Sequence, residues 1–240
     1  MTTEMTRIVE DHGALLLAPD CPAQFSASLF QPDHWPVARR VGGSGRGNAW
    51  FVADEEGNEL VLRHYLRGGL VARISRDLYI FNGEEQVRSF HELKLLQALR
   101  HRGLPVPEPV AASYQRVGRM LYRAQILVRR IAGAKTFLEC LPELSAGEIE
   151  QVGQTLRHFQ DEGLEHVDLN CKNILLASHN VYLIDFDRCV LHGPGHEGTD
   201  WREANLRRLL RSLNKELPDW PQARLEAVWQ SLRRGYGQPG

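Results

Sequence analysis

The stretch from His166 to Asp187 constrains the fold of this 240-residue chain more than any other. A polar segment, HVDLNCKN, carries Asp168 and Asn173 five residues apart and is followed by two short apolar runs, 174–177 and 181–184. Because Ser-His-Asn separates the two runs, they predict a β-hairpin. Asp185 follows directly at the exit of this hairpin, as the first residue of Asp-Phe-Asp.

The rest of the chain predicts an α+β protein of two lobes, residues 1–130 and 131–240, with a linker near 129–133 and a ligand cleft between them. Apolar residues recur every three positions over 84–102, which indicates an amphipathic helix. Ser145 and Glu148 form the sequence pattern of a capping box, so another helix begins there. The predicted elements are strands around a glycine turn at 42–52, a strand at 59–65, the helix at 84–102, a strand at 120–131, the helix from 145 to 163, and helices at 199–216 and 221–234.

Composition places the chain among ordinary soluble proteins, with 42% hydrophobic and 25% charged residues. The longest aliphatic run of the first 30 residues is Leu15–Leu17, too short for a secretory signal, so we expect the protein to work in the cytoplasm. The four cysteines lack Cys-x-x-Cys spacing, and the ten histidines are scattered along the chain. We therefore expect no disulfide, zinc or histidine-metal site.

The net charge of −1 is unevenly distributed. Residues 63–76 carry four arginines and no acid, and residues 201–240 carry eight basic residues against four acids. Such stretches suit anionic partners such as nucleotides, phosphorylated sugars or anionic lipids, or are solvated faces with ordinary ion pairs. No nucleic-acid motif is present, and no nucleic-acid partner is expected.

The polar residues around the predicted hairpin suit phosphoryl transfer, which needs a group to accept the hydroxyl proton and oxygen ligands for Mg²⁺. The stretch resembles the protein-kinase superfamily, whose catalytic loop reads His-Arg-Asp-Leu-x-x-x-Asn and whose metal motif reads Asp-Phe-Gly. The resemblance implies an ATP-dependent kinase with a small strand-rich first lobe and a mainly helical second lobe. It also implies that Asp168 is the catalytic base and that Asn173 and Asp185 bind Mg²⁺.

The first lobe adds candidates for holding ATP. Gly43, Gly45 and Gly47 lie between predicted strands, where backbone N–H groups approach nucleotide phosphates. Arg63 follows Gly47 by sixteen residues and occupies the strand position at which kinases carry lysine. Glu92 is its expected partner, with Glu84 and Glu85 as alternatives.

Three departures from protein kinases narrow the substrate class. Asn170 replaces the lysine of the catalytic loop, and Asp187 replaces the glycine of Asp-Phe-Gly. Only about ten residues then precede the next predicted helix, without Ala-Pro-Glu, so there is no room for a segment that docks a peptide. A protein substrate is not expected.

Several blocks resemble the 3-deoxy-D-manno-octulosonic acid (Kdo) kinases of lipopolysaccharide core synthesis. The blocks are Leu62-Arg63-His64-Tyr65-x-Arg67-Gly68-Gly69-Leu70, Pro105-Val106-Pro107-x-Pro109, His166-x-Asp168-Leu169-Asn170 with Asn173-Ile174-Leu175, Ile184-Asp185-Phe186-Asp187, and Trp201-x-x-x-Asn205-Leu206-x-Arg208-Leu209. This resemblance implies transfer of the ATP γ-phosphate to the 4-hydroxyl of Kdo on a lipid A precursor. It also implies a peripheral position on the cytoplasmic face of the inner membrane, at an anionic surface.

Within that reading, Arg67, Arg73 and Arg76 are candidates by charge for contacting the sugar. The apolar run Leu78–Phe81 either faces the membrane or belongs to the core of the first lobe. Trp201 and Asn205 are expected to pack the segment after Asp187 onto the second lobe.

Two other functions stay open. One is a soluble small-molecule phosphotransferase of the aminoglycoside-kinase kind, which shares the His-x-Asp loop but is expected to carry an acidic acceptor face. The other is a pseudokinase, a binding module without turnover, which Arg63 in the lysine position favours and the intact Asp168 disfavours.

Overall fold

The computed structural model describes residues 4–19, 21, 26–41, 49–66, 77–193 and 200–237. It divides into two compact units, Met1–Ala98 with Pro107–Arg130, and Leu99–Val106 with Ile131–Gly240. The segment 99–106 joins the second unit, where Pro105 O accepts a hydrogen bond from Leu183 N at 3.2 Å. The predictions for Gly43, Gly45, Gly47, Arg67, Arg73 and Arg76 lie outside the described residues.

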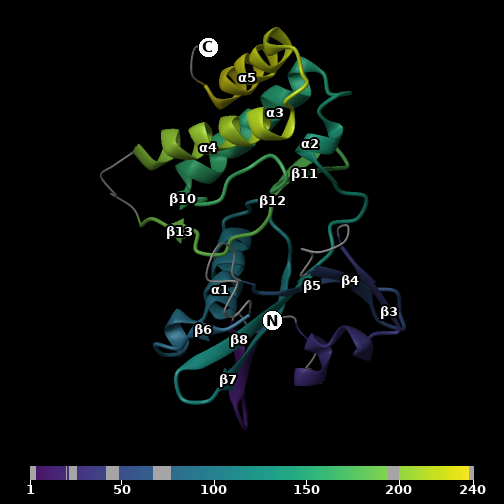
Figure 1. Cartoon of the computed structure of the whole chain (residues 1–240), viewed down its shortest axis with the longest axis vertical. Coiled ribbons are helices and arrows are strands. Elements are labelled where there is room, and N and C mark those ends of the chain that lie inside the picture. Colours follow the sequence, from purple (N-terminus) through teal and green to yellow (C-terminus); the bar gives the residue numbers. More distant parts are fainter. Residues whose placement is uncertain are drawn as a thin grey trace. The chain divides into compact units, whose positions relative to one another are not determined.

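The first unit is built on an antiparallel sheet (Figure 1). Its strand order is β1-β2-β7-β8-β5-β4-β3, and β6 pairs with β8. The strands are β1 (Thr6–Glu10), β2 (Gly13–Leu17), β3 (Val37–Arg40), β4 (Ala49–Ala53), β5 (Glu59–His64), β6 (Tyr79–Ile80), β7 (Pro109–Val117) and β8 (Leu121–Arg129). The predicted strands at 59–65 and 120–131 correspond to β5 and β8, whereas the sequence did not predict the hairpin β1–β2.

The two faces of this sheet are covered differently. Neighbouring residues of a strand point to opposite faces, so Leu62 and Arg63 of β5 lie on different sides. On the side of Leu62, an apolar core takes in Phe30 of the short 3₁₀ helix η1 (Ala27–Phe30) and Trp35, which follows η2 (Pro32–His34). On the side of Arg63 lies α1 (Arg88–His101), whose Ser89 hydroxyl donates to Ser113 O of β7 at 2.8 Å.

The periodicity that predicted a helix over 84–102 is confirmed in its buried positions. Val87, Phe90, Leu93, Leu96 and Leu99 are all at most 2% exposed. The start differs from the prediction because a 3₁₀ turn, η4 (Glu84–Gln86), precedes α1.

The second unit is mainly helical, with two small sheets (Figure 1). Its helices are α2 (Phe137–Cys140), α3 (Ala146–Asp161), α4 (Asp200–Glu216) and α5 (Gln222–Tyr236), and its strands are β9 (Lys135–Thr136), β10 (Leu164–Glu165), β11 (Ile174–Ala177), β12 (Asn180–Leu183) and β13 (Val190–Leu191). Strand β10 pairs with β13, and β12-β11-β9 form the other sheet. The predicted α+β class is confirmed.

Local sequence signals account for the helices of this unit. Ser145 and Glu148 form the predicted capping box at the start of α3. Helix α3 packs closely on α5, since a Cβ atom on Gly153 would overlap the backbone oxygen of Leu232. Glycine at 153 therefore sets how near the two helices approach.

Candidate active site

The predicted catalytic loop lies between β10 and β11 and is held by its own hydrogen bonds. Asn170 Nδ2 and Asn173 Nδ2 donate to Asp168 O at 2.9 and 3.0 Å. Asn170 Oδ1 also accepts from Lys172 N at 2.9 Å. The Asp168 side chain is exposed, so its carboxylate faces solvent on a backbone whose carbonyl oxygen accepts two hydrogen bonds. An exposed carboxylate on a fixed loop can accept a proton from a bound hydroxyl.

Asp185 is brought beside this loop by the hairpin β11–β12. Its neighbour Ile184 donates its backbone N–H to Asn173 O at 3.0 Å, which joins the start and the end of the hairpin. Asp185 has φ of 65°, in the left-handed region that aspartate tolerates better than most residues. Three of the residues that the sequence predicted therefore gather at the base of one hairpin, namely Asp168, Asn173 and Asp185.

His166 ties the same two segments together. Its Nε2 lies 3.0 Å from Ile184 O, and because a carbonyl only accepts, Nε2 carries the proton. Burial lowers the pKa of His166 below its usual value, so the ring stays neutral. Its ring lies 5.4 Å from that of Phe186. His166 therefore holds the loop rather than exchanging protons with a substrate.

Trp201 and Asn205, which are expected to pack the segment after Asp187 onto the second lobe, contact different residues. Trp201 lies with its ring 5.1 Å from that of His192. Asn205 is only 1% exposed, and its Oδ1 accepts a hydrogen bond from His166 N at 3.0 Å. The contact of Asn205 with the catalytic loop was not predicted, because it joins residues 39 positions apart without a local pattern.

In the first unit, Arg63 pairs with Glu92 of α1. Arg63 Nη2 lies 2.5 Å from both carboxylate oxygens, and Glu92 is only 3% exposed. Tyr65 donates its hydroxyl hydrogen bond to the same carboxylate. The alternative partners are engaged elsewhere, since Glu84 pairs with Arg7 and Glu85 with Lys94.

The donor set at the hairpin base fits a magnesium ion. Asn173 uses its amide nitrogen on the loop, which leaves an amide oxygen, and Asp185 supplies a carboxylate. Mg²⁺ prefers such oxygen ligands and is commonly held by one or two carboxylates together with substrate phosphates. Among the described residues, no group of three or more His, Cys, Asp or Glu is placed to hold a metal ion by itself.

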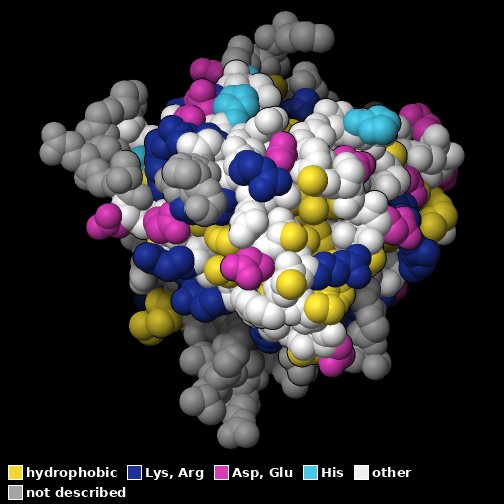
Figure 2. All heavy atoms as spheres, turned by 90° about the horizontal axis from the view of Figure 1, so that it is seen from above, with side chains coloured by type: hydrophobic (Ala, Val, Ile, Leu, Met, Phe, Trp, Pro, Cys, Tyr) yellow, Lys and Arg dark blue, Asp and Glu magenta, His cyan; other side chains and the backbone are white. Residues whose placement is uncertain are grey.

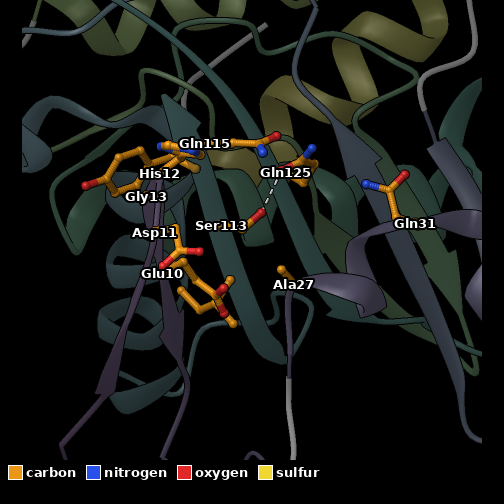
Figure 3. Close-up of a pocket in the computed structure, with 11 residues that line it drawn as sticks. Glu10, Asp11, His12, Gly13, Ala27, Gln31, Ser113, Gln115 and Gln125 are labelled. Atoms are coloured by element: carbon orange, nitrogen blue, oxygen red, sulfur yellow. Dashed lines mark hydrogen bonds between the residues drawn. The ribbon is translucent and has the colours of Figure 1, made fainter. Parts of the chain in front are cut away.

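A hollow of about 280 Å³ in the first unit contains none of these predicted residues (Figure 3). It is lined by the β1–β2 turn and by polar residues of β7 and β8, where Ser113 Oγ donates to Gln125 Oε1 at 2.6 Å. Ala27 and Gln31 also line it, which places it on the side of the sheet opposite α1. The Arg63–Glu92 pair lies on the other side.

The basic stretch at the end of the chain is partly neutralised within the second unit. Arg202 pairs with Asp161 at 2.8 Å, and Arg234 pairs with Glu150 at 3.0 Å. In the space-filling view from above, Lys and Arg side chains are scattered among acidic and apolar ones (Figure 2). At these positions the structure favours a solvated surface with ordinary ion pairs over a binding site for anionic partners.

Comparison with known proteins decides the family. Residues 34–236 match the model of the lipopolysaccharide kinase (Kdo/WaaP) family. The chain belongs to this family. It is therefore a kinase, a phosphotransferase, as the loop motif predicted.

Curated relatives are similar to this chain over most of its length. A 3-deoxy-D-manno-octulosonic acid kinase of Stenotrophomonas maltophilia (strain K279a) is 44% identical over 93% of this chain and 89% of the relative. Kinases of the same name from Xanthomonas axonopodis pv. citri (strain 306) and Xylella fastidiosa (strain M12) are 43% and 42% identical, over 94% and 97% of this chain and 90% and 93% of theirs.

Two solved structures share the kinase-like fold. WaaP in complex with acyl carrier protein has a TM-score of 0.50 at 13% identity, covering 82% of this chain and 79% of WaaP. The amicoumacin kinase hAmiN, in complex with AMP-PNP, Ca²⁺ and Ami, has a TM-score of 0.56 at 13% identity, covering 83% of this chain and 71% of its own. Both confirm the predicted kinase-like fold.

None of the described helices is both long and apolar enough to cross a bilayer.

Proposed function

We propose that this family member transfers the γ-phosphate of ATP to a hydroxyl of Kdo in lipopolysaccharide inner-core synthesis. The observation that carries the proposal is the meeting of Asp168, Asn173 and Asp185 at the base of one hairpin. The acceptor is supported by relatives of 42 to 44% identity that are named Kdo kinases.

Each site residue then has a chemical task. Asp168 accepts the proton of the acceptor hydroxyl as its oxygen bonds to the γ-phosphorus and the bond to ADP breaks. Asn173 and Asp185 hold Mg²⁺ through oxygen atoms. When bound, this ion neutralises charge on the phosphates. The exposed position of Asp168 supports its role, because an acceptor hydroxyl reaches it without opening the loop.

The first unit supplies the residues proposed to hold ATP. Arg63 contacts phosphate oxygens in place of the usual lysine, and Glu92 fixes the guanidinium from the other side. The backbone at Gly43, Gly45 and Gly47 is proposed to receive the phosphates. The 25% exposure of the Arg63 side chain supports this role, because the side chain stays partly accessible to solvent although Glu92 is buried.

For the acceptor we propose the 4-hydroxyl of Kdo on a lipid A precursor, met by a peripheral protein at the anionic cytoplasmic face of the inner membrane. Basic residues near such a surface contribute about 1 kcal/mol each. No protein substrate is proposed, because the chain after Asp187 has no room for a segment that docks a peptide.

Product analysis tests this acceptor. Purified protein is incubated with Mg-ATP and either a Kdo-lipid A precursor or an aminoglycoside, and the phosphorylated product is mapped by NMR. We expect phosphate on the Kdo 4-hydroxyl and none on the aminoglycoside. Phosphate on another Kdo hydroxyl would correct the position alone. Transfer to the aminoglycoside, or ATP binding without any transfer, would favour the soluble phosphotransferase or the pseudokinase.

A further inference from the structure

Helix α4 presents polar side chains to the catalytic loop from one face. Asn205, Ser212 and Glu216 are separated by seven and then four residues, which brings them to the same side of an α-helix. Leu209 lies on this side as well and is fully buried. Polar residues in such a setting need hydrogen-bond partners, and the loop from 166 to 173 provides them.

Asn205 holds the beginning of the loop. Its Oδ1 accepts from the backbone N–H of His166 at 3.0 Å, and the two residues are 1% and 2% exposed. A buried backbone N–H without a partner is costly, so this contact favours one position of the loop over others. Because the His166 ring also contacts Ile184 O, fixing His166 fixes the approach to Asp185.

Ser212 holds the end of the loop. Its hydroxyl donates to Leu209 O of its own helix at 2.7 Å and accepts from the backbone N–H of Cys171 at 3.0 Å. The first bond fixes the hydroxyl rotor, so its lone pair points steadily at Cys171. One turn further along α4, Glu216 pairs with Lys172 at 2.6 Å. That pair is partly exposed and is the weaker of the contacts.

The two anchors, the buried Asn205 and the half-buried Ser212, lie on either side of Asp168. The Asp168 side chain is exposed, so the backbone of the loop sets the point from which its carboxylate extends. We infer that Asn205 and Ser212 are positioning residues, which fix the backbone of the catalytic loop so that Asp168 meets the acceptor hydroxyl. The inference rests on the proposed function, since it assigns these residues to that reaction.

Substitutions along α4 test the inference. Asn205→Leu removes the acceptor for His166, Asn205→Asp keeps it, and Ser212→Ala removes the acceptor for Cys171. Asn214→Leu is the matched control, because Asn214 is exposed and donates to Leu210 O of its own helix at 2.8 Å. Initial rates of phosphate transfer from ATP to a Kdo-lipid A precursor give kcat and the KM for ATP of each variant.

We expect kcat to fall about ten- to hundredfold in Asn205→Leu and Ser212→Ala, since small misplacements of a catalytic group cost that much. The KM for ATP stays within about twofold, because an interaction made only in the transition state is lost. Asn205→Asp and Asn214→Leu keep most of the wild-type kcat. Wild-type kcat in both Asn205→Leu and Ser212→Ala, or an Asn205→Asp variant as slow as Asn205→Leu, would overturn the inference.

Amide hydrogen exchange decides the case if Asn205→Leu fails to fold. In Ser212→Ala the amide of Cys171 is expected to exchange faster than in the wild type, while distant helical amides keep their rates. An unchanged exchange rate at Cys171 would contradict the role of Ser212 in holding the loop. A wild-type protein that transfers no phosphate would instead contradict the proposed function, and the exchange rates would still show whether α4 holds the loop.

Discussion

The Arg63–Glu92 pair offers a test that depends on the first unit alone. Glu92→Leu removes the partner of a guanidinium group and of the Tyr65 hydroxyl. Breaking a buried ion pair costs about 3–5 kcal/mol, whereas exposed pairs contribute about 0–1 kcal/mol. Arg63 is 25% exposed and so keeps some of its hydration, and we therefore expect loss of the ion pair to cost about 2 kcal/mol of stability. The lost hydrogen bond of Tyr65 adds about 1 kcal/mol.

We therefore expect Glu92→Leu to lower the free energy of unfolding by about 3 kcal/mol. The assay is urea unfolding followed by tryptophan fluorescence, with Trp35 and Trp50 as reporters in the first unit. The wild type, Arg63→Leu, Glu92→Leu and the double variant form a double-mutant cycle. A coupling of about 1.5–2 kcal/mol is predicted. A coupling below about 0.5 kcal/mol would refute the buried pair, since an exposed contact gives that value.

Three further predictions concern the second unit, the pH dependence of stability and the metal ligand. Gly153→Ala is expected to destabilise the protein by about 2–3 kcal/mol, because the new methyl group meets the backbone of α5. Gly147→Ala, with open space around it, is expected to stabilise α3 by about 0.5–1 kcal/mol. Urea unfolding midpoints that shift in the same direction in both variants would contradict the close packing of α3 on α5. Burial lowers the pKa of His166 and His64 below the usual 6.5, so the unfolded chain binds protons first and stability falls as the pH drops below 6.5. Unfolding measured from pH 8 to pH 5 should be flat above 6.5 and lose at most about 1.4 kcal/mol per pH unit for each histidine below it; a loss of stability as pH rises from 6.5 to 8 would have the wrong sign for this cause. Asp185→Ala is expected to abolish the increase in nucleotide affinity that Mg²⁺ gives, in titrations with and without the ion, and an unchanged increase would remove Asp185 as a ligand.

Local patterns made parts of this fold predictable. The capping box at Ser145 marks the start of α3, and the three-residue apolar spacing after Val87 gives the buried face of α1. The Ser-His-Asn turn predicts the hairpin whose strands are β11 and β12, and with it the meeting of Asp168, Asn173 and Asp185. In each case the signal lies within about 20 residues of the structure that it predicts.

The N-terminal hairpin was missed because its second strand is buried at every residue after Gly13. Residues 14–17 are all at most 6% exposed, so they lack the alternation of a half-buried strand. Strand β2 also pairs with β7, about a hundred residues further along. No strand was predicted at β7, whose first residue is Pro109. The contacts of Asn205 and Ser212 with the loop likewise depend on tertiary packing that no local pattern encodes.

The most direct test of the central claim is transfer of labelled γ-phosphate from ATP to a Kdo-lipid A precursor by the wild type and by Asp168→Ala. Asp219→Ala is the matched control, since Asp219 is an exposed aspartate in the connection between α4 and α5. The proposed mechanism predicts transfer by the wild type and by Asp219→Ala, and none by Asp168→Ala, which still binds Mg-ATP. Transfer by Asp168→Ala at the wild-type rate would contradict the role of Asp168, and no transfer by the wild type would contradict the proposed reaction.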